Sequence, residues 1–336
     1  MDLAGLGFAL LHRFRARHDP RDLDEAVDVL RSAVPAAAPG FERLACRSDL
    51  CVALFARYQT RDTRGDLDEA AGIARTVSPA DAPAGVLLNF AHLLDERART
   101  AGVLDDLDLA VDLVRRSVAA TETPRPPVER PHGYLRLLAD GIFDDGAVRR
   151  EPTLAEVLHL LGAYLRRRFA WTNVLADVDE AIEVARRLVA MTGGEAGHTR
   201  ALATLSFTLK SRWLEARREP DLDEAVATGR RALAGNPEDP GLAVALSDTL
   251  KHRFDHHRAG HDLDEAIELG RRADGDRAPE AFGNLSALLR ARFDRDRDPA
   301  DLDEAIGLGR RAVEAGRDDA FDQPARQYAL ARALLA

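Results

Sequence analysis

One five-residue string decides the fold: Asp22-Leu23-Asp24-Glu25-Ala26. The same string begins again at residues 66, 221, 262 and 301, and altered forms of it begin at 106 and 177. Most of these starts are about 40 residues apart, a period typical of helical hairpin repeats. The sequence therefore predicts seven repeats, which we number one to seven. Position 0 is the first Asp of each string.

The residues before each string predict a first helix, helix A. Position −12 is Leu in every repeat, position −16 is Leu or Phe, and position −8 is aromatic in all but the third repeat. In repeat five these residues are Leu209, Leu205 and Trp213. Such spacings place the side chains on one face of a helix. Position −15 is always a small residue, such as Ser206, which favours close packing against a neighbour.

The string itself predicts the start of a second helix, helix B. Its Asp-x-x-Glu spacing is that of a capping box, so position 0 is predicted to be the N-cap with Glu at N3. Positions +1, +4, +5 and +8 form the apolar stripe of this helix, and position +4 is always Ala. A small residue at −15 and Ala at +4 would let the two helices of a hairpin approach closely.

Leu-small-x-x-Leu on helix A followed by a constant Ala on helix B resembles the tetratricopeptide repeat (TPR). The Asp-Leu-Asp-Glu-Ala signature, preceded by Arg-Phe as in Arg292-Phe293, is similar more specifically to long-period TPR-like arrays. Those arrays accompany CHAT-type caspase-like protease domains and related bacterial signalling proteins. The resemblance implies an all-α, right-handed α-solenoid of about seven helical hairpins. It also implies a non-enzymatic scaffold that binds a protein or peptide in a groove lined by helix A.

The long interval between the strings at 106 and 177 divides the array. It carries four prolines from Pro124 to Pro131, which exclude a continuous helix there. We expect repeats one to three over 1–118, a Pro-rich insertion with one irregular helix over 119–152, and repeats four to seven with a terminal helix over 153–336. The insertion either adds a helix to the stack or lies across it. The apolar last residues favour a second hypothesis, that the chain is a sensor or regulatory array from a larger CHAT-type protease or other signalling enzyme.

Composition narrows the functional classes. The chain is 46% hydrophobic and 31% charged, which predicts a folded protein, and its net charge of −10 with 5% aromatic residues argues against a nucleic-acid partner. With no apolar run of membrane-spanning length and no signal peptide pattern, we expect a cytoplasmic protein without a membrane partner. The sequence contains no catalytic motif and implies no cofactor, so we expect no enzymatic activity. Cys46 and Cys51 lack the further cysteines that a disulfide framework or a zinc site requires.

Two arginines recur in every repeat. Arg at −9 and Asp at +2 lie at helix ends that an antiparallel hairpin brings together, so we expect a salt bridge between them within each repeat. The other arginine, at +9, has two interpretations, a packing role or a row that binds anions. These residues are Arg31, Arg75, Arg115, Arg186, Arg230, Arg271 and Arg310.

A histidine cluster lies at the end of helix A in repeat six. His252, His256, His257 and His261 surround Asp255, and one i,i+4 pair could hold a metal ion. Other repeats carry assorted polar residues there, so we interpret the cluster as a solvated loop and predict no metal site.

The variable face of helix A, at positions −14, −11 and −10, is the predicted binding surface, because repeat arrays vary their binding residues and keep their packing residues. It is apolar in the first two repeats, with Phe8, Leu11 and Phe55, and basic in the later ones. Such a row of cations suits an acidic segment or a C-terminal carboxylate, although a solvated helix face is the alternative. The predicted partner-binding residues are Arg166, Arg167, Phe207, Lys210, Lys251, His252 and Arg290.

Overall fold

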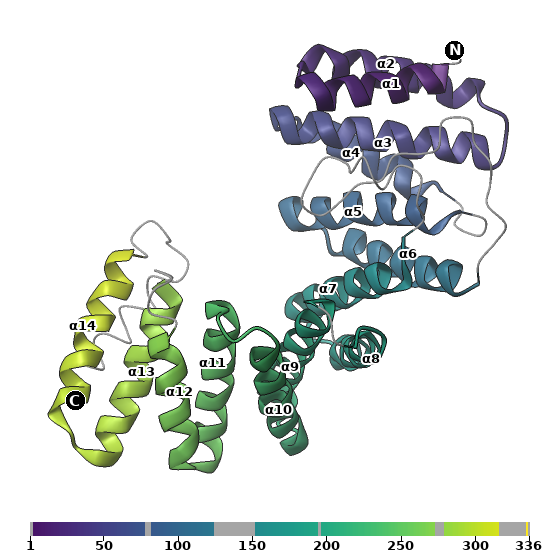
Figure 1. The fold of residues 1–336 in the computed structure, drawn as a ribbon. Helices are drawn as coiled ribbons and strands as arrows, with labels where there is room; N and C mark the ends of the chain where they lie inside the picture. The colour runs from purple at the N-terminus through teal and green to yellow at the C-terminus, as the bar shows by residue number, and fades with distance from the viewer. Residues whose placement is uncertain are drawn as a thin grey trace. The chain divides into compact units, whose positions relative to one another are not determined.

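The computed structural model describes residues 3–77, 82–123, 152–193, 196–272 and 279–315, together with residue 334. These residues form fourteen α-helices and no strand, two helices for each repeat (Figure 1). The predicted all-α array of helical hairpins is therefore confirmed. In chain order the helices are α1 (Leu3–Arg17), α2 (Pro20–Ala36), α3 (Phe41–Arg61), α4 (Arg64–Arg75), α5 (Ala84–Ala101), α6 (Leu104–Glu122), α7 (Leu154–Thr172), α8 (Leu175–Met191), α9 (Ala196–Ala216), α10 (Glu219–Gly235), α11 (Pro240–His257), α12 (Gly260–Arg272), α13 (Pro279–Asp296) and α14 (Pro299–Ala315).

The chain divides into two compact units, Met1–Val184 and Ala185–Ala336. In the first unit each helix from α1 to α7 packs on the next, and in the second unit the same holds from α9 to α14. Because α6 packs directly on α7, repeat four follows repeat three in the stack. Of the predicted insertion, residues 119–122 belong to α6, and 124–151 lie outside the described residues. The predicted terminal helix lies almost entirely outside them after 315.

Every helix A of the seven hairpins ends in the same left-handed turn. The residue at −4 has a positive φ in each hairpin: 53° at Asp62, 57° at Arg258 and 70° at Gly102, for example. Its backbone N–H donates to the carbonyl oxygen at −8, as from Asp62 to Tyr58 at 2.7 Å. This turn reverses the chain so that helix B returns along helix A.

Helix B begins two residues earlier than predicted, so position 0 is its third residue and not its N-cap. In repeat one the N-cap is Asp19, whose side chain accepts a hydrogen bond from the Arg21 N–H at 3.0 Å. Pro20 follows at N1, a position that suits proline because no N–H is needed there. The prediction of a capping box at position 0 was wrong because the Asp22 carboxylate is used for an arginine instead of a backbone N–H.

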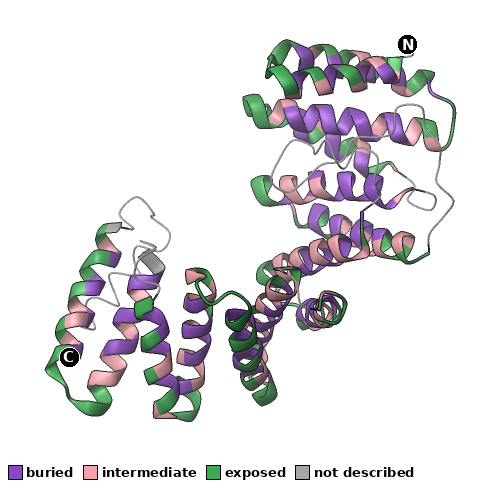
Figure 2. Cartoon of the chain, in the orientation of Figure 1, coloured by how far each residue is buried: buried purple, intermediate pink, exposed green. Residues whose placement is uncertain are grey.

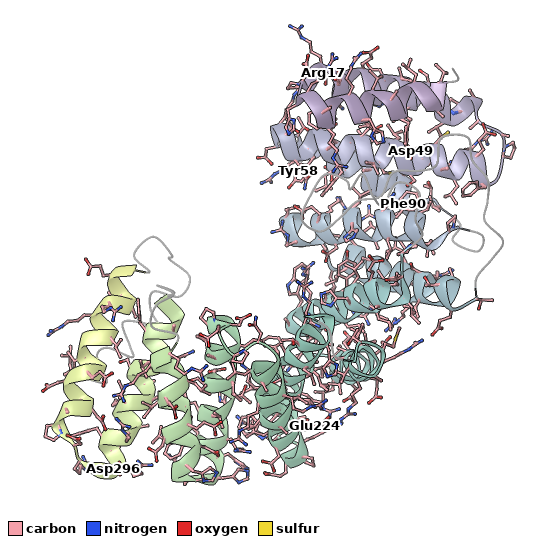
Figure 3. All side chains as sticks on the ribbon, viewed as in Figure 1. Arg17, Asp49, Tyr58, Phe90, Glu224 and Asp296 are labelled. Carbon is pink, nitrogen blue, oxygen red and sulfur yellow. The ribbon has the colours of Figure 1, made fainter. Side chains whose placement is uncertain are left out.

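The small residue at −15 packs against the constant Ala at +4, as predicted. The Ser206 hydroxyl donates to the Ala225 carbonyl oxygen at 2.7 Å, and the Cys51 thiol makes the equivalent contact with Ala70 at 3.6 Å. Cys51 is fully buried, and its burial raises the pKa of the thiol. Buried and exposed residues alternate along the helices at helical spacing, and exposed ones also gather at the helix ends (Figure 2). In the first unit, for example, the fully buried Phe90 lies on α5 (Figure 3).

Candidate functional site

The recurring arginine at −9 binds the aspartate at position 0 of its own repeat. The closest nitrogen–oxygen distances of these ion pairs are 2.5–2.7 Å in all seven repeats. In repeat five the Arg212 guanidinium holds both carboxylate oxygens of Asp221, at 2.6 and 2.8 Å. The predicted pairing within each repeat with Asp at +2 was therefore wrong. The aspartate at position 0 lies in the first turn of helix B and the one at +2 lies just beyond it, and the guanidinium pairs within its hairpin with the more deeply buried one at position 0.

The aspartate at +2 instead contacts the arginine of the following repeat. Arg253 reaches Asp223 at 3.3 Å, and Arg168 reaches Asp108 at 3.2 Å across the sequence insertion. The guanidinium at −9 thus joins its own hairpin to the one before it in repeats two, three, four and six, whereas in repeat seven Arg295 contacts Asp264 instead.

The arginine at +9 joins each repeat to the next one in the opposite sense. Its guanidinium binds the Glu at +3 of the following repeat, as from Arg186 to Glu224 at 2.7 Å and from Arg115 to Glu180 at 2.5 Å. Glu224 is labelled on α10 in Figure 3. Repeat three has Leu109 at +3, and there Arg75 binds Asp106 instead. Six of these arginines therefore have a packing role, which leaves the variable positions as candidates for binding a partner.

A pocket lies between α9, α10 and α11 of the second unit. It is a small, shallow hollow open to solvent, and its lining is mostly apolar. Gly229 at +8, where repeat one has Leu30, lets its neighbours approach closely at the floor, since an added methyl there would lie 3.0 Å from the Ser206 hydroxyl and 3.1 Å from Leu246. The lining residues are Ala203, Ser206, Phe207, Lys210, Gly229, Ala232, Leu242, Ala245, Leu246 and Thr249.

Two of the predicted binding residues, Phe207 and Lys210, line this pocket. Phe207 is 51% exposed at its rim, and the Lys210 ammonium lies 5.4 Å from the centre of the Phe207 ring. Lys210 also binds Asp248 of α11 at 2.5 Å. His252 lies 3.8 Å from the same carboxylate and packs on Trp213, and burial lowers the pKa of this imidazole. Phe207, Lys210, Trp213, Asp248 and His252 thus lie together beside the pocket.

The other predicted residues of the second unit are engaged on their own helices. Lys251 binds Asp255 at 2.8 Å, and Arg290 binds Asp294 at 3.3 Å, each one turn away. Neither residue lines the pocket. The basic residues are thus paired with carboxylates, so the helix-A face of this unit carries both signs of charge.

The two predicted residues of the first unit have different surroundings. Arg167 binds Asp95 of α5, and burial raises the pKa of that carboxyl group. The neighbouring Arg166 has a buried Nη1 without a hydrogen-bond partner among the described residues. Burial and the adjacent charge of Arg167 lower the pKa of this guanidinium.

Most of the apolar part of the predicted surface in the first two repeats is buried, and only Phe8 among the apolar residues predicted there is half-buried. Leu11 and Val52 are fully buried, and Phe55 is 6% exposed. Helix A packs against the helix A of the following repeat, as α1 does on α3 and α3 on α5, and these side chains fill the interface. The first two repeats therefore present no apolar surface at these three positions.

Sequence reasoning missed the residues that form the floor of the pocket. Gly229 and Ala232 belong to helix B, and Leu242 belongs to the start of the next helix A. No signal within a repeat singled them out, since Gly at +8 recurs as Gly270 and Gly309 in repeats six and seven.

No helix among the described residues is both long enough and apolar enough to cross a membrane.

The comparisons with known proteins give only distant likenesses. No protein-family model matches the sequence, and no curated protein matches it. Among solved structures, a tetratricopeptide repeat protein from Parabacteroides merdae is 13% identical and has a TM-score of 0.49, covering 98% of this chain and 99% of that one. The pilF protein of Pseudomonas aeruginosa is 13% identical with a TM-score of 0.46, covering 89% and 98%. A thermophilic TPR protein of Thermus thermophilus is 18% identical with a TM-score of 0.40, covering 73% and 100%.

Proposed function

We propose that the chain is a non-enzymatic scaffold that binds a protein or peptide on the helix-A face of the second unit. The observation that carries this proposal is the pocket beside Phe207, a large apolar side chain that is 51% exposed. Apolar hollows with a few polar groups at the rim are common recognition sites for a single anchoring side chain.

The lining indicates what such a partner would offer. Small residues such as Ala203 and Ala245 keep the hollow open to an aliphatic side chain, which would gain by burial against Leu242 and Leu246. The pair formed by Lys210 and Asp248 at one end can exchange partners with polar groups of a bound peptide.

The proposal is tested with peptides selected from a displayed random library on the purified chain. Ala245→Trp fills the pocket from its exposed side and should weaken the selected peptides by about tenfold or more, since a lost anchor costs on the order of 1.4 kcal/mol or more. Ala227→Trp is the matched control, because Ala227 is an exposed alanine on the outer face of α10. Affinities are measured by fluorescence anisotropy.

Two outcomes would contradict the proposal. One is a selection that yields no peptide binding above background. The other is a set of peptides whose affinity Ala245→Trp and Phe207→Ala leave unchanged.

A second candidate function, binding of an acidic segment or a C-terminal carboxylate, is favoured by Arg166. A buried guanidinium without an acceptor is costly, and a carboxylate from a partner would remove that cost. Peptides with a free C-terminus should then bind more tightly than their amides, and Arg166→Met should abolish the difference. Reversing the charges of Lys210 and Lys251 together tests whether these two lysines contribute to binding. If they do, the variant binds the peptide more weakly and its affinity depends less on salt. An origin in a larger CHAT-type enzyme remains a prediction from the repeat signature.

A further inference from the structure

Three groups able to bind a metal ion meet at one edge of the second unit. Glu219 is the first residue of α10, and His256 and His257 lie in the last turn of α11. His256 Nε2 lies 2.6 Å from one Glu219 oxygen, and His257 Nε2 lies 3.9 Å from the other. One ligand atom from each residue lies within 4.8 Å of the others.

The repeat geometry explains why these residues meet. The end of each helix A lies beside the first turn of helix B in the preceding repeat. At the equivalent place Arg295 of repeat seven donates to the Gly260 carbonyl oxygen at 3.2 Å, and Arg61 of repeat two donates to that of Pro20 at 3.3 Å. Repeat six replaces the arginine with histidines, and repeat five offers Glu219 opposite them. Imidazole and carboxylate groups bind transition metals, whereas a guanidinium does not.

We propose that Glu219, His256 and His257 form a binding site for a divalent transition-metal ion such as Zn²⁺. Two imidazole nitrogens and one carboxylate oxygen are a donor set that zinc accepts, with water in the fourth position. The three side chains are 59%, 36% and 41% exposed, so an ion reaches them without any opening of the fold. Such a donor set favours Zn²⁺, Ni²⁺ and Cu²⁺ over Mg²⁺ and Ca²⁺.

Binding would connect two repeats. Glu219 belongs to repeat five and the histidines to repeat six, so a bound ion links the start of α10 to the end of α11. The ion should therefore raise the melting temperature of the chain, because it binds the folded state and not the unfolded one.

The chain contains its own reporter for this site. The His256 ring centre lies 5.7 Å from that of Trp213. The chain has two tryptophans, and the other, Trp171, is 43% exposed, so Trp171→Phe leaves Trp213 as the single fluorophore. Cu²⁺ held by His256 would quench Trp213.

The experiment titrates Zn²⁺ by calorimetry and Cu²⁺ by Trp213 fluorescence in the Trp171→Phe chain. We expect one ion per chain. Glu219→Gln and His257→Gln should each weaken binding by about tenfold or more, comparable to the loss when a residue that supports a metal ligand is removed. Both variants keep the contact between His256 and Trp213, so a smaller quench reports loss of the ion. His261→Gln is the control, because this histidine lies nearby in the first turn of α12, and its side chain is 73% exposed and outside the trio.

The proposal is overturned if the double variant His256→Gln, His257→Gln binds Zn²⁺ as tightly as the parent. It is also overturned if His261→Gln lowers the affinity as much as Glu219→Gln does. A melting temperature that Zn²⁺ raises equally in the parent and the double variant would place the ion elsewhere and has the same consequence.

Discussion

Each hairpin buries one aspartate at position 0, whose side chain is at most 9% exposed in any repeat. A buried carboxylate is costly unless a cation compensates it, and here the arginine at −9 does so with two hydrogen bonds in most repeats. The hydrogen bond from Arg292 holds the pKa of Asp301 below its usual value. Replacing either partner alone should therefore destabilise the fold, because the remaining charge would be buried without its partner.

A double-mutant cycle tests this pairing in repeat five. Arg212→Ala and Asp221→Ala should each destabilise the chain by on the order of 3 kcal/mol, and the double variant should cost less than their sum. The measurement is urea unfolding followed by circular dichroism. Arg212→Ala with Asp223→Ala is the control cycle and should be additive within about 0.5 kcal/mol, since Asp223 contacts Arg253. Equal coupling in both cycles would contradict the assignment.

The left-handed residue at −4 gives a second prediction for single residues. Gly102 has a φ of 70° with no atom near its missing Cβ, so Gly102→Ala changes only the backbone energy and should cost about 1 kcal/mol. Asp62→Gly should have the opposite sign and gain about 0.5 kcal/mol, because Asp62 has a φ of 53°. The test is the free energy of unfolding of the two variants. An increase in stability for Gly102→Ala would contradict the left-handed requirement at this position.

At the scale of the element, the hairpin depends on the close crossing of its two helices. The Ala225 side chain is fully buried where α10 crosses α9, and its carbonyl oxygen accepts the Ser206 hydroxyl. A larger side chain at this crossing would have to push the two helices apart.

Ala225→Leu should therefore destabilise the chain by about 1 to 3 kcal/mol. Ala227→Leu, two residues along on the exposed face of α10, should change stability by no more than about 0.5 kcal/mol. Thermal unfolding of both variants provides the test. Equal melting temperatures would show that the crossing tolerates the added volume.

The hairpins could be predicted from the sequence because their packing residues recur at fixed offsets, whereas much of the site could not. Leu209 and Ala225 follow from helical periodicity alone. The partner of Arg212 did not, because an N-cap at position 0 would use its carboxylate on the backbone. In the structure Asp221 lies inside the first turn and is buried, whereas Asp223 lies about 200° further round the helix and is exposed. The pocket depends on what Leu246 of the next repeat leaves uncovered beside Gly229, and a pattern within one repeat contains no information about that contact.

At the scale of the whole molecule, ion pairs connect successive repeats. At six successive junctions the arginine at +9 binds an acidic residue of the next repeat. Five of these pairs lie at the surface, so each contributes only about 0.2–1 kcal/mol and is weakened by salt, whereas Arg75 binds the buried Asp106. Their effect on an array comes from repetition, because stability there depends on the contacts between neighbours.

Neutralising the three glutamates of the second unit that accept these arginines tests this. Glu224→Gln, Glu265→Gln and Glu304→Gln combined should lower the melting temperature and should reduce its dependence on salt. The control changes three exposed glutamates outside the junctions to glutamine, Glu238, Glu268 and Glu314. Melting curves at low and high salt are compared. A control that loses as much stability as the junction variant would show an effect of net charge alone.

The matching ends of the repeats have an evolutionary consequence. Every repeat carries an arginine at −9, and every repeat except the third carries a glutamate at +3, so each repeat offers the same charged residues to the repeat before it. A segment of about 40 residues can therefore be duplicated, deleted or exchanged by recombination without creating an unmatched charge at the new boundary. Repeat three, with Leu109 at +3, is the exception. The arginine at +9 of any repeat placed before it would lack a glutamate partner and would have to bind another carboxylate, as Arg75 binds Asp106. Related genes should therefore differ in repeat number more readily than in the residues of the junctions.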